Sequence, residues 1–226
     1  FDVNAAEFTD FPAAKRSEAA AAFFPQLITE VTRQVADEGT TIKTLWKLFD
    51  GSLIESVLMR YPTRTTLCIS SQVGCGMGCP FCATGKLGLT RNMSTGEIIE
   101  QVRVAAKMMR DGEVAGGEGR LSNIVFMGMG EPLLNLREVM RALQSLNNDK
   151  GLNFSPRRIT VSTCGIEKGL AELGASGLAY LAVSLHAPTQ ELRARIMPKA
   201  ARWPLDQLLA ALKSYPLKTR ERITFE

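Results

Sequence analysis

Residues 65–82 read TTLCISSQVGCGMGCPFC, an apolar, strand-like run followed by a glycine-rich loop that holds three cysteines. Similar apolar runs recur at 123–128, 158–163, 180–186 and 222–226, and helical patterns lie between them. Short continuous apolar strands separated by amphipathic helices are typical of a parallel sheet covered by helices. We therefore expect an α/β fold, built as an open sheet or as part of a barrel.

The clearest helical pattern covers residues 94–110. Ser94 and Glu97 form a capping-box signature at its start, and the apolar residues that follow share one helical face. Further helices are expected at 136–147, 166–173 and 204–213.

The N-terminal part of the chain has a different pattern. Residues 1–22 look helical, and strand-like runs follow from about residue 25. Within 43–59, KTLWKLFDGSLIESVLM, the dipeptide Asp50-Gly51 separates two apolar runs and predicts a hairpin. We expect a small α+β domain over residues 1–63 and an α/β domain over 64–226, with the fifth strand cut short by the end of the chain.

Composition is that of an ordinary globular protein. The 226 residues are 45% hydrophobic, and 27 basic against 23 acidic residues leave a net charge of +4, which permits a nucleic-acid partner without requiring one. No apolar run approaches the about 20 residues that cross a bilayer, so no membrane association is expected. No signal peptide is visible, although the chain begins at Phe1. Three of the five cysteines fall within eight residues, which favours a reducing cytoplasm over a disulfide framework.

The three clustered cysteines are Cys75, Cys79 and Cys82, with the spacing C-x3-C-x2-C. Three thiolates on one tight loop can hold three irons of a [4Fe–4S] cluster and leave the fourth iron open to a small molecule's amino and carboxylate groups. The alternative is a structural zinc ion, which needs a fourth ligand. That ligand could come only from Cys68, Cys164 or His186.

Polar residues also end the later strands. Gly130 and Glu131 follow the second apolar run, Ser162 ends the third, and Ser184 and His186 end the fourth. Each has a structural explanation as well: a tight turn with a helix cap, a strand-end cap or a hydrogen-bonded core histidine. If the cluster prediction holds, these strand ends face one cavity, since ligand sites of parallel sheets lie there.

Two residues before the cluster loop are also candidates. Cys68 could be a small buried hydrophobic residue, as free cysteine often is. Glu55 is the one acid in the apolar run 53–59, and it could face solvent or act as a base toward the cluster domain.

The ordered strings CISSQVGCGMGCPFCATGKLGLTRNMSTGEI, FMGMGEPLLN, STCG and SLHAP closely resemble the RlmN family of dual-specificity RNA methyltransferases, within the radical S-adenosylmethionine (SAM) superfamily. The resemblance runs from about residue 43 to residue 226. It implies a partial (β/α) barrel and methylation of carbon 2 of an adenine in 23S ribosomal RNA and in transfer RNA. The related Cfr enzymes, which methylate carbon 8, are one alternative, and a zinc-stabilised RNA-binding module without catalysis is another, from a different functional class.

The resemblance also implies roles for individual residues. Cys68 matches a resolving cysteine, which opens a protein–RNA adduct by forming a disulfide with a methyl-carrying cysteine. Glu55 matches the acid that removes the proton from carbon 2 of the adduct. No role is implied for Cys164. The cluster ligands are Cys75, Cys79 and Cys82, and the SAM contacts are Gly130, Glu131, Ser162, Ser184, Leu185 and His186.

The resemblance extends to partners. It implies an electron donor such as flavodoxin or ferredoxin, a monomer in the cytoplasm, and an RNA-binding role for the N-terminal domain. The family's methyl-carrying cysteine and a late asparagine contact have no counterpart in these 226 residues. We therefore expect the chain as given to bind the cluster and SAM without completing a methylation.

Overall fold

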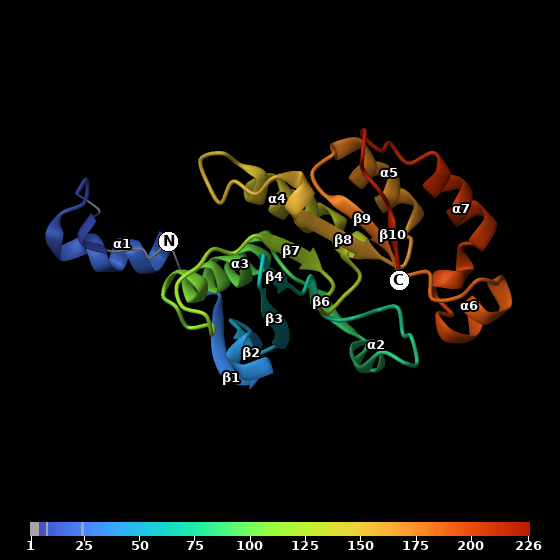
Figure 1. Cartoon of the computed structure of the whole chain (residues 1–226). Helices are drawn as coiled ribbons and strands as arrows, with labels where there is room; N and C mark the ends of the chain where they lie inside the picture. The colour runs from blue at the N-terminus through green and yellow to red at the C-terminus, as the bar shows by residue number, and fades with distance from the viewer. Residues whose placement is uncertain (1–4, 8, 24) are drawn as a thin grey trace.

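The computed structural model describes residues 5–7, 9–23 and 25–226, and these residues form one eight-stranded sheet in the order β1-β2-β3-β4-β7-β8-β9-β10 (Figure 1). Strands β1 to β4 pair antiparallel, whereas β4, β7, β8, β9 and β10 pair parallel. The predicted α/β fold with a parallel sheet is confirmed. The bounds are β1 Ile28–Ala36, β2 Thr41–Leu48, β3 Leu53–Tyr61, β4 Arg64–Cys68, β7 Asn123–Phe126, β8 Ile159–Thr163, β9 Tyr180–Val183 and β10 Thr224–Phe225.

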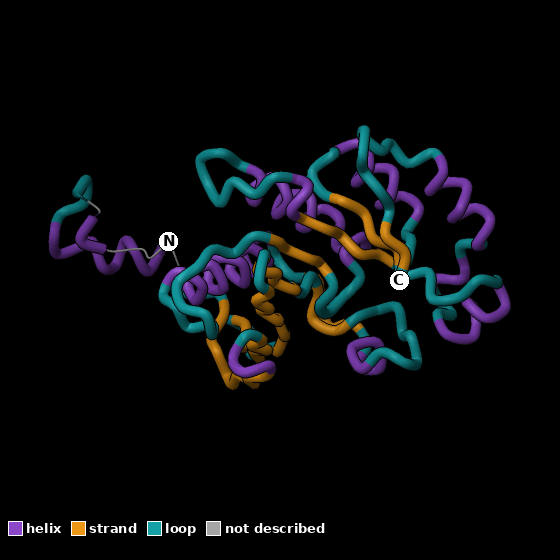
Figure 2. The backbone as a smooth tube through the Cα atoms, viewed as in Figure 1, coloured by secondary structure: helices purple, strands orange, loops and turns teal. Residues whose placement is uncertain are grey.

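The predicted hairpin joins β2 to β3. Gly51 has a φ of +85°, a backbone conformation that glycine adopts without steric cost, and the side chain of Asp50 accepts a hydrogen bond from the Ser52 amide. The sheet then continues from β3 into β4, so the hairpin and the parallel strands form a single curved layer (Figure 2). Because this layer crosses residue 63, the division into two domains there stays a prediction.

The helices expected at 94–110, 136–147, 166–173 and 204–213 are present, but the predicted N-terminal helix is wrong for residues 9–12, which form a turn and bend, and an α-helix begins only at Arg16. Pro12 explains this, because proline disfavours a helical conformation in the residue before it. In α3 (Thr95–Arg110) the hydroxyl of Ser94 accepts from the Glu97 amide, and the Glu97 carboxylate accepts from the Ser94 amide, as the capping box predicts. Sequence periodicity does not predict α2 and α6, because helices of five and seven residues have too few turns to show it. The other bounds are α1 Arg16–Phe23, α2 Ala83–Leu87, α4 Leu136–Asn147, α5 Glu167–Ser176, α6 Gln190–Ile196 and α7 Leu205–Lys213. Residues 1–4 and 8 of the predicted N-terminal helix lie outside the described residues.

One face of the sheet is covered and forms the core. Ile124, Phe126, Ile159 and Val161 are buried among apolar residues of the helices. Since side chains alternate along a strand, the residues between them lie on the other face, where burial is lower in β3, β4 and β7. Within the described part of the chain, no helix has the length and apolarity needed to cross a membrane.

Candidate functional site

A cavity of about 210 Å³ lies at the carboxyl ends of the parallel strands. Its lining brings together predicted residues from four separate parts of the chain: Cys75, Cys79, Cys82, Gly130, Glu131, Ser162, Ser184 and His186. A larger groove of about 710 Å³ lies between β1 and α3, but it contains no cysteine. We therefore locate the site by its chemistry and not by cavity size.

The cysteine loop connects β5 (Gln72–Gly74) to α2, and its three thiols form no disulfide. Cys82 caps α2, because its sulfur accepts from the Gly85 amide at 3.4 Å. Burial raises the pKa of the thiols of Cys75 and Cys79, so a bound metal is what would favour their thiolates at neutral pH. The glycines fit this close packing, since a Cβ on Gly74 would lie 2.0 Å from a carbonyl oxygen.

The donor set distinguishes a cluster from a zinc site. No three His, Cys, Asp or Glu side chains of the described residues are grouped to hold a single metal ion. The three cysteines nevertheless line one cavity, from which each could reach a different iron of a larger cluster. The three cysteines fit a [4Fe–4S] cluster, and no side chains of the described residues are arranged as the four-ligand site that structural zinc needs.

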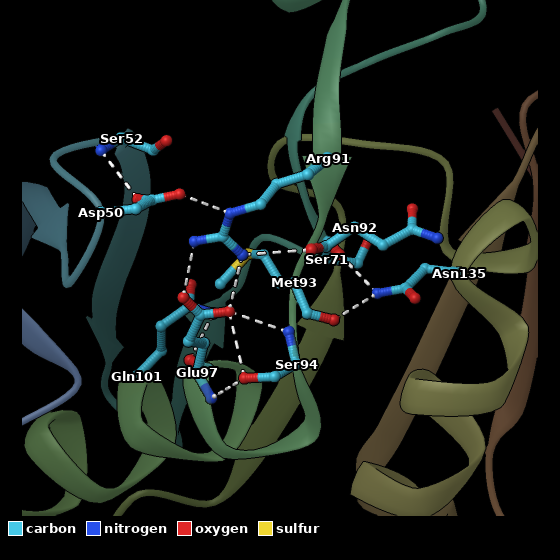
Figure 3. A network of polar contacts seen from close by, with 10 residues as sticks. All are labelled: Asp50, Ser52, Ser71, Arg91, Asn92, Met93, Ser94, Glu97, Gln101 and Asn135. Carbon is cyan, nitrogen blue, oxygen red and sulfur yellow. Dashed lines mark hydrogen bonds and ion pairs between the residues drawn. The ribbon is translucent and has the colours of Figure 1, made fainter. Parts of the chain in front are cut away.

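Buried amide side chains hold the base of the loop (Figure 3). The Asn135 amide donates to the carbonyls of Ser71 and Met93, both at 2.8 Å, and so ties the two ends of the β5–β6 ribbon together, β6 being Leu89–Asn92. Gln101 bonds both the amide and the carbonyl of Ser70, at 2.9 and 3.0 Å. Because these backbone groups are buried and fully paired, the segment entering the loop is held in one conformation.

An ion-pair network lies beside this base (Figure 3). The guanidinium of Arg91 bonds both carboxylate oxygens of Glu97, at 2.8 and 3.0 Å, and the carboxylate of Asp50 at 2.6 Å. Burial acts to raise the pKa of Glu97, but Arg91 and Ser94 together outweigh it and hold that pKa below its ordinary value. The network thus joins the hairpin turn to β6 and α3.

We expect Glu97→Gln to lower the free energy of unfolding by about 3 kcal/mol at pH 7, because it removes the charge that faces Arg91 from a fully buried position. Because the pKa of Glu97 is lower in the folded state, its ionisation stabilises the fold at pH values above the ordinary pKa of 4.5. This stabilisation is lost as the pH falls through the folded-state pKa. Urea unfolding at pH 7 and pH 4 should therefore show a smaller difference between variant and wild type at pH 4.

Glu100→Gln is the matched control on the same helix. It breaks a more exposed pair with Arg103 and should cost less than about 1 kcal/mol. Equal losses in the two variants would contradict the special role of the Glu97 pair.

Glu131 is both a helix cap and a cavity residue. Its carboxylate is 4% exposed and accepts hydrogen bonds from the hydroxyl of Thr163 at 2.6 Å, the amide of Cys164 at 2.8 Å and the amide of Leu133 at 3.0 Å. Gly130 has a φ of +103°, and a Cβ there would lie 2.5 Å from a neighbouring side chain. This turn therefore requires glycine followed by an acceptor, and it places a buried negative charge beside the cysteines.

Two hydroxyls converge on one carboxylate that the sequence analysis did not select. Ser162 and Ser184 donate to Oε2 of Glu226, at 2.9 and 3.2 Å, and Glu226 lines the cavity. The sequence carried a signal for it, because Glu226 ends the fifth apolar run, 222–226, much as Ser162 ends the third.

His186 lies at the cavity with its backbone in the left-handed region, at a φ of +57°. Its ring meets the ring of Phe81 edge to face, with centroids 5.3 Å apart. Leu185 differs from the other predicted contacts, because its side chain packs against the core and only its amide, which donates to the carbonyl of Glu226, lies near the site.

Cys68 lies on the open face of the sheet and outside the cavity lining. It pairs with Val57 on one side and Val125 on the other, and Val125 pairs in turn with Thr160. Ser162 follows Thr160 by two residues, so Cys68 and Ser162 lie on the same face. Burial raises the pKa of the Cys68 thiol to about 11, so the thiol is protonated at neutral pH.

Glu55 lies on this same face, two residues before Val57. Its carboxylate is half exposed and pairs with the ammonium of Lys43 at 2.8 Å. The structure thus brings Glu55 and Cys68 to one side of the sheet, but not into the cavity that holds the other predicted residues.

The comparisons with known proteins agree with this arrangement. Residues 69–224 match the model of the radical SAM superfamily. This chain belongs to the radical SAM superfamily. A solved structure, described as a radical SAM methyltransferase from Sphaerobacter thermophilus, superposes with a TM-score of 0.89 at 45% identity, covering 99% of this chain and 64% of that one. The radical SAM type of fold is therefore confirmed.

Curated radical SAM relatives are more similar still. A probable dual-specificity RNA methyltransferase RlmN of Bifidobacterium longum is 73% identical over all of this chain and 59% of its own length. The RlmN enzyme of Nitratidesulfovibrio vulgaris is 59% identical over 94% of this chain and 58% of its own length. The chain thus spans less than two thirds of the length of these relatives.

Membership in the radical SAM superfamily confirms the predicted cofactors, a [4Fe–4S] cluster and SAM. Cys75, Cys79 and Cys82 would hold the cluster from their single loop. Glu131 and the hydroxyls of Ser162 and Ser184 supply polar groups on the facing wall of the cavity. When bound, the two cofactors supply one-electron chemistry that ordinary side chains lack.

Proposed function

We propose that this chain is the catalytic core of a radical SAM RNA methyltransferase that acts on carbon 2 of an adenine in 23S ribosomal RNA and in transfer RNA. The observation that best supports this proposal is that one cavity is lined both by the cysteine loop and by the polar ends of three parallel strands. The names of the relatives add the substrate, because those at 73% and 59% identity are RlmN enzymes. They favour carbon 2 over the carbon-8 alternative.

The position of the site suits a large substrate. Carbon 2 of adenine is unactivated toward polar methyl transfer, which is why radical cofactors are useful there. Glu55 and Cys68 lie on the open face, beside the cavity and not within it, where a base extended from an RNA chain could reach both. In this proposal Glu55 accepts the proton of carbon 2, and Cys68 attacks the sulfur of the methyl-carrying cysteine.

Residues 1–63 are proposed as an RNA-binding accessory region and residues 64–226 as the catalytic region. The net charge of +4 is compatible with an RNA substrate. We further propose a monomer in the cytoplasm that receives electrons from a flavodoxin or a ferredoxin.

The proposed function is tested by mass spectrometry of ribosomal and transfer RNA from cells that lack the protein. We expect loss of 2-methyladenosine in both RNA classes and its return when a full-length version is supplied. Such a version can be made by extending this chain with the remaining residues of the Bifidobacterium longum relative, of which it spans 59%. Unchanged 2-methyladenosine, or loss of 8-methyladenosine instead, would refute the assignment.

In this full-length version, we expect Glu55→Gln to slow release of methylated RNA by about 100-fold or more, since a glutamine cannot accept the proton of carbon 2. The covalent protein–RNA adduct should accumulate and be visible on denaturing gels. The control is Glu30→Gln, which removes another ion-paired surface carboxylate of the same sheet, bonded to Arg33. Release of methylated RNA at the wild-type rate by the Glu55→Gln variant would show that Glu55 is not the proton acceptor.

A further inference from the structure

Arg193 is a buried arginine whose hydrogen bonds are incomplete. It lies on α6 and is 0% exposed. Its Nη2 donates to the carbonyl of Cys164 at 2.6 Å, whereas Nε and Nη1 have no partner among the described residues. The described residues also place no carboxylate within ion-pair distance of this guanidinium.

An unpaired guanidinium in the interior is costly, because it loses its hydration without gaining an opposite charge. Burial accordingly lowers the pKa of Arg193. Arginine stays charged in proteins, so these two donors suit an anion or a strong acceptor that the described residues do not supply.

The surroundings of Arg193 indicate what that partner is. Met197 directly follows α6, its amide donates to the carbonyl of Arg193, and it lines the cavity and packs with Cys79 and Cys164. Cys164, whose carbonyl accepts from Arg193, packs in the same cluster of side chains as Cys79, so the guanidinium lies close to the cysteine loop. Arg193 itself is not part of the cavity lining, so its guanidinium does not line the space that a bound small molecule would occupy.

We propose that Arg193 is a positioning residue for the iron–sulfur cluster, donating from Nε and Nη1 to the sulfur of Cys79 when that thiolate binds iron. A cluster held by three thiolates carries net negative charge, which the buried guanidinium would offset. Hydrogen bonds to ligand sulfurs and nearby positive charge favour the reduced, more negative state of a cluster. The inference rests on cluster binding by the three cysteines, and it does not depend on the RNA substrate.

The first test is a redox titration of the reconstituted cluster followed by electron paramagnetic resonance. We expect Arg193→Met to lower the ratio of reduced to oxidised cluster at a fixed potential about tenfold, which for one electron is about 59 mV. Arg193→Lys keeps the charge and should shift the ratio less. The control is Arg195→Met, an exposed arginine of the same helix, which should leave it unchanged. An unchanged ratio in an iron-loaded Arg193→Met protein would overturn the proposal.

The second test starts from the unmutated protein. Protein labelled with ¹⁵N in its arginine side chains should show coupling between a ¹⁵N nucleus and the reduced cluster in pulsed electron paramagnetic resonance, and Arg193→Lys should abolish that coupling. A loaded cluster without ¹⁵N coupling would overturn the role of Arg193. Protein that binds no iron at all would instead refute the cluster site.

Discussion

Cys79→Ala is expected to abolish the cluster: iron and acid-labile sulfide fall to background, and the broad absorbance near 400 nm disappears. The reason is that all three predicted ligands come from one loop, so removing the middle one leaves two thiols for a group that needs three. SAM cleavage, measured as dithionite-dependent release of deoxyadenosine, should fall to background with it.

Cys164→Ala is the matched control. Cys164 is 5% exposed and packs against Cys79, which is 8% exposed, so the two substitutions disturb similarly buried positions of one cluster of side chains. Cys164 is not a predicted ligand, and its variant should keep iron at the wild-type level. Equal iron loss in both variants, or retained iron in Cys79→Ala, would show that the ligand set is wrong.

In the full-length version described above, Cys68→Ala is expected to trap a covalent protein–RNA adduct and abolish turnover. Without this thiol no nucleophile on the open face opens the adduct by forming a disulfide. A denaturing gel with labelled RNA measures the trapped species, and Cys164→Ala again serves as the control that should turn over. Normal turnover by Cys68→Ala would end its assignment as the resolving cysteine.

The pKa of Cys68 gives this step a pH dependence. With the pKa raised to about 11, the thiolate fraction increases about tenfold per pH unit below that value. Single-turnover decay of the adduct in the unmutated full-length version should therefore accelerate from pH 7 to pH 9. A rate that does not change over this range would mean that another group deprotonates Cys68 or that another step is slower.

Features that depend on neighbours in the chain could be predicted from the sequence. The capping box of α3 links Ser94 to Glu97, and the hairpin turn needs only Asp50 and Gly51. The cysteine spacing is local in the same way, because all three thiols belong to one eight-residue loop. Short-range geometry is encoded in short segments, so these predictions were confirmed wherever the structure tests them.

Contacts between distant segments could not be predicted in this way. Glu226 meets Ser162 across 64 residues, and Arg193 meets Cys164 across 29. Neither Glu226 nor Arg193 stands out in the sequence, because charged residues are usually exposed to solvent. Only their positions in the folded structure make these two residues unusual. The partners of Glu131 show the same limit: the turn indicates an acceptor, but only folding brings the hydroxyl of Thr163 to it.

Residue order alone thus specifies the type of chemistry: three thiols at fixed spacing, on a loop that follows a strand of a parallel sheet. Tertiary structure decides which other side chains lie near these thiols. Strand register places Cys68 and Glu55 on the open face, and folding buries Arg193 of helix α6 against the carbonyl of Cys164. The physical reason is that spacing within a loop is set by covalent geometry, whereas burial, charge pairing and sheet register arise only when distant segments pack together.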